Sequence, residues 1–250
     1  MYRFFVEKEQ IDTVTKKAVI TGEDFNHIRN VLRMKPNEEI SVMVPGDDNE
    51  YRCAVADYTE DAVQLDLLFV KESNVELPCG ITLYQALPKA DKMEFVITKA
   101  VELGAVRIVP VATDRSVVKL AGDRADRKIT RWNAIAEAAA KQSKRAVIPE
   151  VTDIMTVSQA LEDSRMFQAK IMPYELEDPD SMGRTRRVIG GIEPGMKVAV
   201  FIGPEGGFTE EEVEKARRAG FSPVTLGRRI LRTETAGLVV LSWIIYNTEL

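Results

Sequence analysis

Two short apolar runs near the end of the chain are each followed by a glycine-bearing loop and then by a helix signal. Residues 198–202 lead into the loop FIGPEGGFT at residues 201–209, and residues 221–226 lead into TLGRRILRTETA at residues 225–236. Apolar runs of this length are typical of buried strands in a parallel sheet. Ligands of open α/β sheets bind at the carboxyl ends of such strands. The stretch therefore predicts an α/β fold with a ligand site formed by the two loops.

The segment between the two loops carries the start and stop signals of a helix. Thr209 and Glu212 have the spacing of a capping box, in which each side chain accepts a hydrogen bond from the other residue's amide. Glutamates in the first turn complement the positive end of the helix dipole. Gly220 is suited to ending the helix. We expect a helix that starts directly after the first loop.

The first loop excludes two common nucleotide sites. No Lys-Ser/Thr pair follows it, and it lacks the G-x-G-x-x-G order of a dinucleotide site. Gly203, Gly206 and Gly207 let the backbone approach a ligand closely, whereas Glu205 would repel a phosphate. Amide donors with one carboxylate suit a ligand that carries hydroxyls, amines or a positive centre. The alternative is a tight turn with an incidental acid.

The cysteine and histidine content limits the chemistry further. His27 is the only histidine, and Cys53 and Cys79 are isolated, so the sequence predicts neither a zinc site nor a histidine triad. Isolated cysteines are typical of a reducing compartment. No segment resembles a signal peptide, and the apolar run at residues 236–246 is too short to span a bilayer. We expect a cytoplasmic protein without membrane or metal partners.

Residues 1–72 predict a small β-rich domain. A helix at about residues 22–32 sets Arg29 and Arg33 one turn apart. Turn residues at 45–49 and 60–61 indicate hairpins. A polar, proline-terminated stretch at residues 71–78 indicates a domain boundary, which we place between residues 72 and 73. Runs rich in Val, Ile, Phe and Tyr predict strands at residues 2–6, 16–20, 39–45, 51–58 and 62–70.

Residues 73–250 alternate between strand and helix patterns, which favours a parallel α/β sheet. Residues 176–187 lack periodicity and predict an irregular excursion. The last helix, from about Thr233, is apolar nearly all round, which indicates burial on several sides and a subunit interface. Further strands are expected at residues 81–87, 106–111 and 166–172, and further helices at residues 88–103, 123–143 and around 158–163.

The charge distribution is uneven. The formal net charge is −5, yet residues 1–72 carry 9 basic and 15 acidic groups whereas residues 115–145 carry 9 basic and 3 acidic groups. A basic stripe is compatible with contact to nucleic-acid phosphates, and the alternative is a solvated helix face.

The two loop motifs, IGPEGGFT and LGRRILRTETA, together resemble the C-terminal signature of SPOUT-class RNA methyltransferases. Within that class the chain is similar to the RsmE-type enzymes that methylate N3 of a uridine in small-subunit (16S) ribosomal RNA. The resemblance extends over the whole chain, although residues 140–145, AKQSKR, depart from the acid before Gln and the glycine after Ser that we expect in the family. Other positions that match are residues 2–5, 27–34 and 99–104 together with Glu137, Gln142 and Arg145.

The resemblance implies a PUA-like RNA-binding β-barrel at residues 1–72 and a SPOUT methyltransferase domain at residues 73–250 with a C-terminal trefoil knot. It also implies a homodimer formed through the C-terminal domain, with ribosomal RNA of the small subunit as substrate. S-adenosyl-L-methionine is the implied cofactor. Carried over onto this sequence, the cofactor residues are Ile202, Gly203, Glu205, Gly206, Leu226, Gly227, Ile230, Leu231 and Arg232.

Methylation at N3 of uracil requires loss of a proton, so the reaction needs a base or a cation that favours the anionic ring. Arg232 is the first candidate for stabilising that anion or gripping the substrate. Glu205 and Glu234 are candidate carboxylates, and the alternative for each is a helix cap or a salt-bridge partner. The candidate RNA contacts are Arg29, Arg33, Arg115, Arg131, Lys141 and Arg145.

Two rival functions stay open at this point. A related SPOUT enzyme would methylate a ribose 2′-hydroxyl instead of a base. A non-catalytic RNA-binding module with a vestigial pocket is the second rival, and the intact glycines of both loops speak against it.

Overall fold

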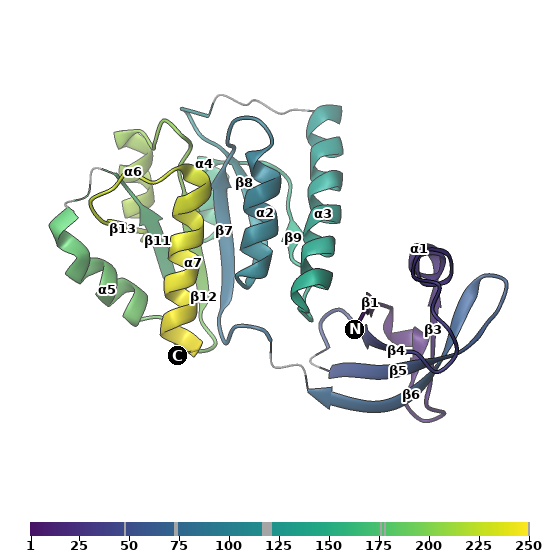
Figure 1. Ribbon diagram of the computed structural model, residues 1–250. Helices are drawn as coiled ribbons and strands as arrows, with labels where there is room; N and C mark the ends of the chain where they lie inside the picture. The colour runs from purple at the N-terminus through teal and green to yellow at the C-terminus, as the bar shows by residue number, and fades with distance from the viewer. Residues whose placement is uncertain (48, 73–74, 117–121, 176, 178, 250) are drawn as a thin grey trace. The chain divides into compact units, whose positions relative to one another are not determined.

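The computed structural model describes residues 1–47, 49–72, 75–116, 122–175, 177 and 179–249. The chain divides into two compact units (Figure 1). The first comprises Met1–Glu76 and Ala140–Ile148, and the second comprises Leu77–Ala139 and Pro149–Leu250.

The first unit is a curled six-stranded sheet with strand order β1-β4-β5-β6-β3-β2. Neighbouring strands pair antiparallel except β1 and β4, which are parallel. The five predicted strands are confirmed, and the two-residue β2 was not predicted because so short a segment carries no alternation. The strands are β1 (Arg3–Phe5), β2 (Ile11–Asp12), β3 (Lys17–Thr21), β4 (Glu39–Met43), β5 (Asn49–Tyr58) and β6 (Ala62–Glu72), and a 3₁₀ turn, η1 (Lys8–Gln10), precedes β2.

Alternate side chains of these strands form the core of the first unit. In β5, Tyr51, Cys53 and Val55 are buried, whereas Arg52 and Ala54 between them are half-buried. This alternation follows from the two-residue period of a strand. Burial, with a smaller contribution from Asp66, raises the pKa of the Cys53 thiol to about 12.

The helix predicted at residues 22–32 is present but changes type. A short helix, α1 (Gly22–Asn26), continues into a π-helical turn, η2 (His27–Leu32), and Arg33 ends it with a φ of 54°. Arg29 therefore lies on the helical segment while Arg33 lies in the left-handed residue after it. Both side chains are exposed.

The second unit is a parallel sheet with strand order β10-β8-β7-β12-β11-β13, and β9 pairs with β8. This architecture confirms the predicted α/β class. The strands are β7 (Gly80–Ala86), β8 (Ala105–Ala112), β9 (Glu150–Val151), β10 (Met155–Thr156), β11 (Ala169–Pro173), β12 (Lys197–Ile202) and β13 (Ser222–Val224). The helices are α2 (Lys92–Glu102), α3 (Asp123–Ser143), α4 (Val157–Asp163), α5 (Met182–Gly190), α6 (Glu210–Arg218) and α7 (Thr233–Glu249).

An aromatic cluster anchors the first loop to the sheet. Phe201 of β12 packs against Phe208 of the loop, with ring centroids 5.0 Å apart, and also against Tyr84 and Phe221. All four side chains are buried. Aromatic packing of this kind fixes both the strand and the loop that follows it.

The prediction of an irregular excursion at residues 176–187 is wrong in its second half. A 3₁₀ turn, η3 (Pro179–Ser181), leads into α5, while residues 176 and 178 lie outside the described residues. Thr185 and Ile189 of α5 are buried, and the Thr185 hydroxyl donates to the Thr225 carbonyl. A tertiary contact thus stabilises a helix that has weak local signals.

The last helix buries one face and leaves apolar side chains on the other. Val240, Leu241 and Ile244 are buried, and α7 packs against β12 and beside α2 (Figure 1). Trp243 is half-buried and Tyr246 is exposed. Burial within one chain therefore accounts for only part of the apolar surface of this helix.

Candidate functional site

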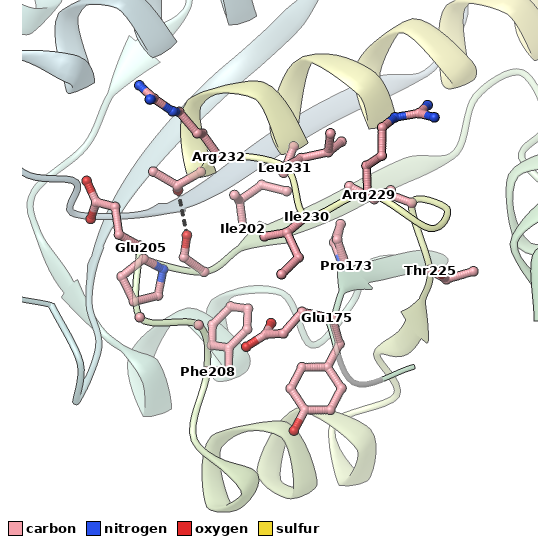
Figure 2. Close-up of a pocket in the computed structure, with 18 of the residues that line it drawn as sticks. Pro173, Glu175, Ile202, Glu205, Phe208, Thr225, Arg229, Ile230, Leu231 and Arg232 are labelled. Carbon is pink, nitrogen blue, oxygen red and sulfur yellow. Dashed lines mark hydrogen bonds between the residues drawn. The ribbon is translucent and has the colours of Figure 1, made fainter. Parts of the chain in front are cut away.

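A cavity of about 530 Å³ lies at the carboxyl ends of β11, β12 and β13 (Figure 2). Gly203–Phe208, here the first loop, forms one wall, and Thr225–Arg232, here the second loop, forms another. The end of β11 with the two residues after it (173–175) and Lys92 at the start of α2 complete the lining, together with Ile202, Thr233 and Ala236. Neighbouring parallel strands end at the same edge of a sheet, which explains why segments distant in sequence meet here.

The predicted capping box holds the end of the first loop. The Thr209 hydroxyl accepts from the Glu212 amide at 3.2 Å, and the Thr209 amide donates to Glu212 Oε2 at 2.8 Å. The other oxygen of Glu212 accepts from the Asp114 amide at 2.9 Å. The buried Glu212 carboxylate thus ties the first loop to the segment after β8.

Thr233 joins the two loops. Its hydroxyl donates to the Gly203 carbonyl at 2.5 Å and accepts from Gln85 Nε2 at 2.9 Å. Gly227 has a φ of 100°, a conformation that few other residues adopt without strain. The second loop is therefore held at its end by a buried hydrogen-bond chain that reaches β7.

A lysine bridges two of the three predicted catalytic residues. Lys92 Nζ lies 3.0 Å from Glu205 Oε1 and 3.3 Å from Glu234 Oε2. Burial opposes ionisation of Glu205, but hydrogen bonds from its own amide, the Lys89 amide and Lys92 outweigh burial and lower its pKa. The hydrogen bond to Glu205 is the main cause that raises the pKa of Lys92. The Glu205 carboxylate is thus held ionised at the mouth of the cavity.

The third predicted catalytic residue, Arg232, is largely free. Its side chain is 82% exposed, and NH1 lies 3.9 Å from Glu234 Oε1. An exposed guanidinium beside the cavity can reach a bound substrate, which a fully paired one cannot do without losing its partner.

All nine predicted cofactor residues line the cavity. Glu234 does not line the cavity, but its carboxylate lies 3.3 Å from Lys92 Nζ and 3.9 Å from Arg232 NH1, and both of these residues do. Sequence reasoning missed Lys92, Glu175, Phe208 and Thr233 as site residues. Phe208 and Thr233 lie within the two predicted loops, and Glu175 and Lys92 follow strands of the parallel sheet, so the rule that carboxyl ends of strands converge could have indicated them.

The structure pairs several of the predicted RNA contacts with carboxylates or carbonyls. Arg115 NH1 donates to the carbonyls of Gly206 at 2.9 Å and Phe208 at 3.4 Å, so it braces the first loop. Arg131 NH2 lies 2.8 Å from Glu94 Oε2 on an exposed surface of the second unit.

The remaining predicted RNA contacts belong to the first unit. Lys141 Nζ lies 3.2 Å from Asp24 Oδ2, and Arg145 is buried against Glu76. The Arg29 guanidinium lies over the Phe25 ring, 5.6 Å from its centroid, and donates to the Thr59 carbonyl at 3.2 Å. Arg29 and Arg33 are the exposed members of this first-unit set, and Arg115 and Arg131 of the second unit are exposed as well.

The sequence predicted neither a metal site nor a membrane-spanning segment, and the described residues bear on both. Those residues contain no group of three or more His, Cys, Asp or Glu side chains that could hold a metal ion. They also form no helix that is long and apolar enough to cross a membrane.

Comparison with protein families matches two models to the chain. A model described as an RNA methyltransferase domain covers residues 75–245. A second, described as an RNA methyltransferase PUA domain, covers residues 20–68. Together they span most of both units.

Two similar proteins of known name align with this chain over nearly their whole length. Ribosomal RNA small subunit methyltransferase E of Bacillus subtilis is 37% identical, with 100% of this chain and 98% of that protein covered. The protein of the same name from Mesomycoplasma hyopneumoniae is 31% identical, with 97% and 98% covered. The crystal structure of the Neisseria gonorrhoeae protein of that name, bound to S-adenosyl methionine, superposes with a TM-score of 0.82 at 32% identity and covers 98% of this chain and 97% of that one.

Proposed function

This chain belongs to the RNA methyltransferase family that includes ribosomal RNA small subunit methyltransferase E, and we propose that it methylates N3 of a uridine in 16S ribosomal RNA. We further propose S-adenosyl-L-methionine as the methyl donor. The cavity between the two glycine-bearing loops carries this proposal, because it is a ligand-sized site at the expected edge of the sheet.

The residues of the cavity fit this cofactor. Ile202, Leu226 and Ile230 offer apolar surfaces for the faces of an adenine ring. Among the described residues, none accepts a hydrogen bond from the backbone amides of Leu226 and Leu231. Backbone groups left free beside an apolar slot can bind the polar edge of the ring.

When bound, S-adenosyl-L-methionine supplies an electrophilic methyl group on a positively charged sulfur. The protein's own task is to make N3 of uracil nucleophilic. A general base works best when its pKa lies near the operating pH, and the lowered pKa of Glu205 moves it in the opposite direction. We therefore assign the main role to Arg232, whose charge stabilises the anionic ring, and a positioning role to Glu205 and Glu234 through Lys92.

We propose that residues 1–72 form the RNA-binding domain and residues 73–250 the catalytic domain. The PUA-domain match and the two exposed arginines Arg29 and Arg33 support the first assignment. Arg131 and Lys141 are partly exposed in their ion pairs and can exchange a carboxylate for a phosphate. Arg115 contributes indirectly, by bracing the first loop.

Three further features belong to the same proposal. The exposed apolar side chains of α7 support a homodimer formed through the second unit. The return of α7 to the middle strands of the sheet, with Thr233 bonded to Gly203, supports a trefoil knot at the C-terminus. A ribosomal RNA substrate supports a cytoplasmic location.

Calorimetric titration with S-adenosyl-L-methionine is the first test, on the wild type and on Gly206→Val. A Cβ at Gly206 would lie 3.4 Å from Arg115 Cβ, so the larger branched side chain disturbs the first loop. Binding by the wild type and loss in the variant are expected. If the wild type does not bind S-adenosyl-L-methionine, either alone or with small ribosomal subunits present, the result would point to a non-catalytic RNA-binding module.

Nucleoside mass spectrometry of treated 16S RNA then identifies the product. The expected nucleoside is 3-methyluridine, formed from free RNA or from small subunits that lack the modification. A ribose-methylated nucleoside would contradict the proposed target and favour the rival 2′-hydroxyl activity.

A further inference from the structure

A third carboxylate faces the cavity, and neither the loop motifs nor the proposed reaction uses it. Glu175 follows β11 by two residues and lines the cavity. Figure 2 shows its carboxylate directed toward Phe208 and separate from the carboxylate of Glu205. The two acids thus occupy different parts of the site.

The first loop is shaped around this carboxylate. A Cβ added to Gly207 would lie 1.9 Å from Glu175 Oε1, a distance that atoms do not tolerate. Gly207 also has a φ of 68°, in the left-handed region. The glycine therefore leaves the space in which the Glu175 side chain lies.

Glu175 lacks the partners that its neighbours have. Within the described part of the chain, no ion pair or hydrogen bond involves its carboxylate. Glu205 is bonded to Lys92, and Glu177 lies 2.6 Å from Arg217 NH2. Burial, with smaller contributions from the negative charges of Glu175 and Glu210, raises the pKa of Tyr174. An unpaired carboxylate that faces a cavity is available to a cationic ligand group.

We propose that Glu175 binds a positive charge of the methyl donor. The inference rests on the proposed function, which supplies a ligand with two cationic centres, the α-ammonium group and the sulfonium. An RNA phosphate would be repelled at this position, and a neutral uridine offers no cation. Glu175 thus selects for the charged amino-acid portion or the charged sulfur of the cofactor.

Calorimetry with three ligands tests the proposal on the full chain. S-adenosyl-L-methionine carries both cations, S-adenosyl-L-homocysteine carries only the ammonium group, and 5′-methylthioadenosine carries neither. Glu175→Gln should weaken binding of S-adenosyl-L-methionine by roughly 10- to 100-fold, the usual range for a hydrogen bond to a charged group. Binding of 5′-methylthioadenosine should stay within about 3-fold of the wild type.

The second ligand identifies the cation. Equal weakening of S-adenosyl-L-homocysteine assigns Glu175 to the ammonium group, and unchanged binding assigns it to the sulfonium. Equal weakening of all three ligands, or of none, would overturn the proposal. Glu177→Gln is the matched control. It removes the same charge only two residues from Glu175, but the Glu177 side chain pairs with Arg217 and does not line the cavity.

The design separates this inference from the proposed function. A wild type that binds none of the three ligands would overturn both. A wild type that binds S-adenosyl-L-methionine while Glu175→Gln binds it equally well would overturn this inference alone. Glu175→Asp keeps the charge and should retain part of the affinity, and an unchanged thermal unfolding transition checks that each variant is folded.

Discussion

Replacement of Glu76 by alanine is expected to destabilise the first unit strongly. The Glu76 carboxylate accepts from Arg145 Nε at 3.0 Å and NH2 at 2.5 Å, and from the amides of Ala146 at 2.9 Å and Val147 at 3.1 Å. The Arg145 side chain is 4% exposed, so water cannot replace the lost carboxylate. Removing one partner of a buried ion pair costs about 3–5 kcal/mol.

Urea and thermal unfolding measure this loss. Both tryptophans, Trp132 and Trp243, lie in the second unit, so tryptophan fluorescence would not report unfolding of the first unit. Far-UV circular dichroism is therefore the suitable signal. At roughly 2–4 °C per kcal/mol for a chain of this size, the transition of Glu76→Ala should fall by about 6–20 °C. Glu162→Ala is the control, since its ion pair with Arg165 is 74% exposed on both sides and should contribute less than about 1 kcal/mol.

Variants of Glu76 and Arg145 also test whether Arg145 stabilises the fold or contacts RNA. If its guanidinium serves the fold, Arg145→Gln lowers the unfolding temperature, and RNA affinity measured well below the transition changes little. Unaltered stability in Glu76→Ala, or an Arg145→Gln variant that is stable but binds RNA weakly, would refute the reasoning.

Three further predictions concern the site and the core. Arg232→Ala should lower single-turnover methyl transfer by roughly 100-fold or more, a larger effect than its effect on calorimetric affinity for S-adenosyl-L-methionine; unchanged turnover would contradict its role. Lys92→Met should lower thermal stability slightly at pH 7, because the ionised Glu205 loses its partner. The folded-state pKa of Glu205 is lowered. Its contribution to the stability of the folded state is therefore present above the unfolded-state pKa and is lost as pH falls through the folded-state pKa. The unfolding temperatures of wild type and Lys92→Met should therefore converge in acid, and a gap that widens there would argue against the ion pair. Cys53 should resist iodoacetamide in the native protein at pH 8 and react in urea, because burial raises its thiol pKa to about 12; mass spectrometry of the labelled peptide reports which occurs.

Local patterns determined the strands of three or more residues, the two loops and the capped helix between them. Each of these signals lies within about ten residues, so the physical cause is present in the sequence segment itself. The Thr209–Glu212 capping box appears as predicted. The nine proposed cofactor residues lie around one cavity because they come from two such local motifs.

Partners of charged side chains could not be determined in this way. The sequence shows that Arg145 is basic, but Glu76 lies 69 residues away and only folding brings it within 2.5 Å. The same applies to Arg131 with Glu94 and to Lys141 with Asp24. Three basic side chains of the stripe, Arg131, Lys141 and Arg145, thus lie in ion pairs that the sequence alone did not indicate.

The contents of the cavity were likewise decided by tertiary structure. Glu175 follows β11, the first loop follows β12, and the second loop follows β13, and these strands lie side by side only in the folded sheet. Strand order is set by long-range pairing and packing, which no single segment encodes. The sequence by itself determined which segments could bind a ligand. Only the fold decided that Lys92 pairs with Glu205 while the Glu175 carboxylate has no ion-pair partner among the described residues, because the distance between charges depends on segments that are far apart in sequence.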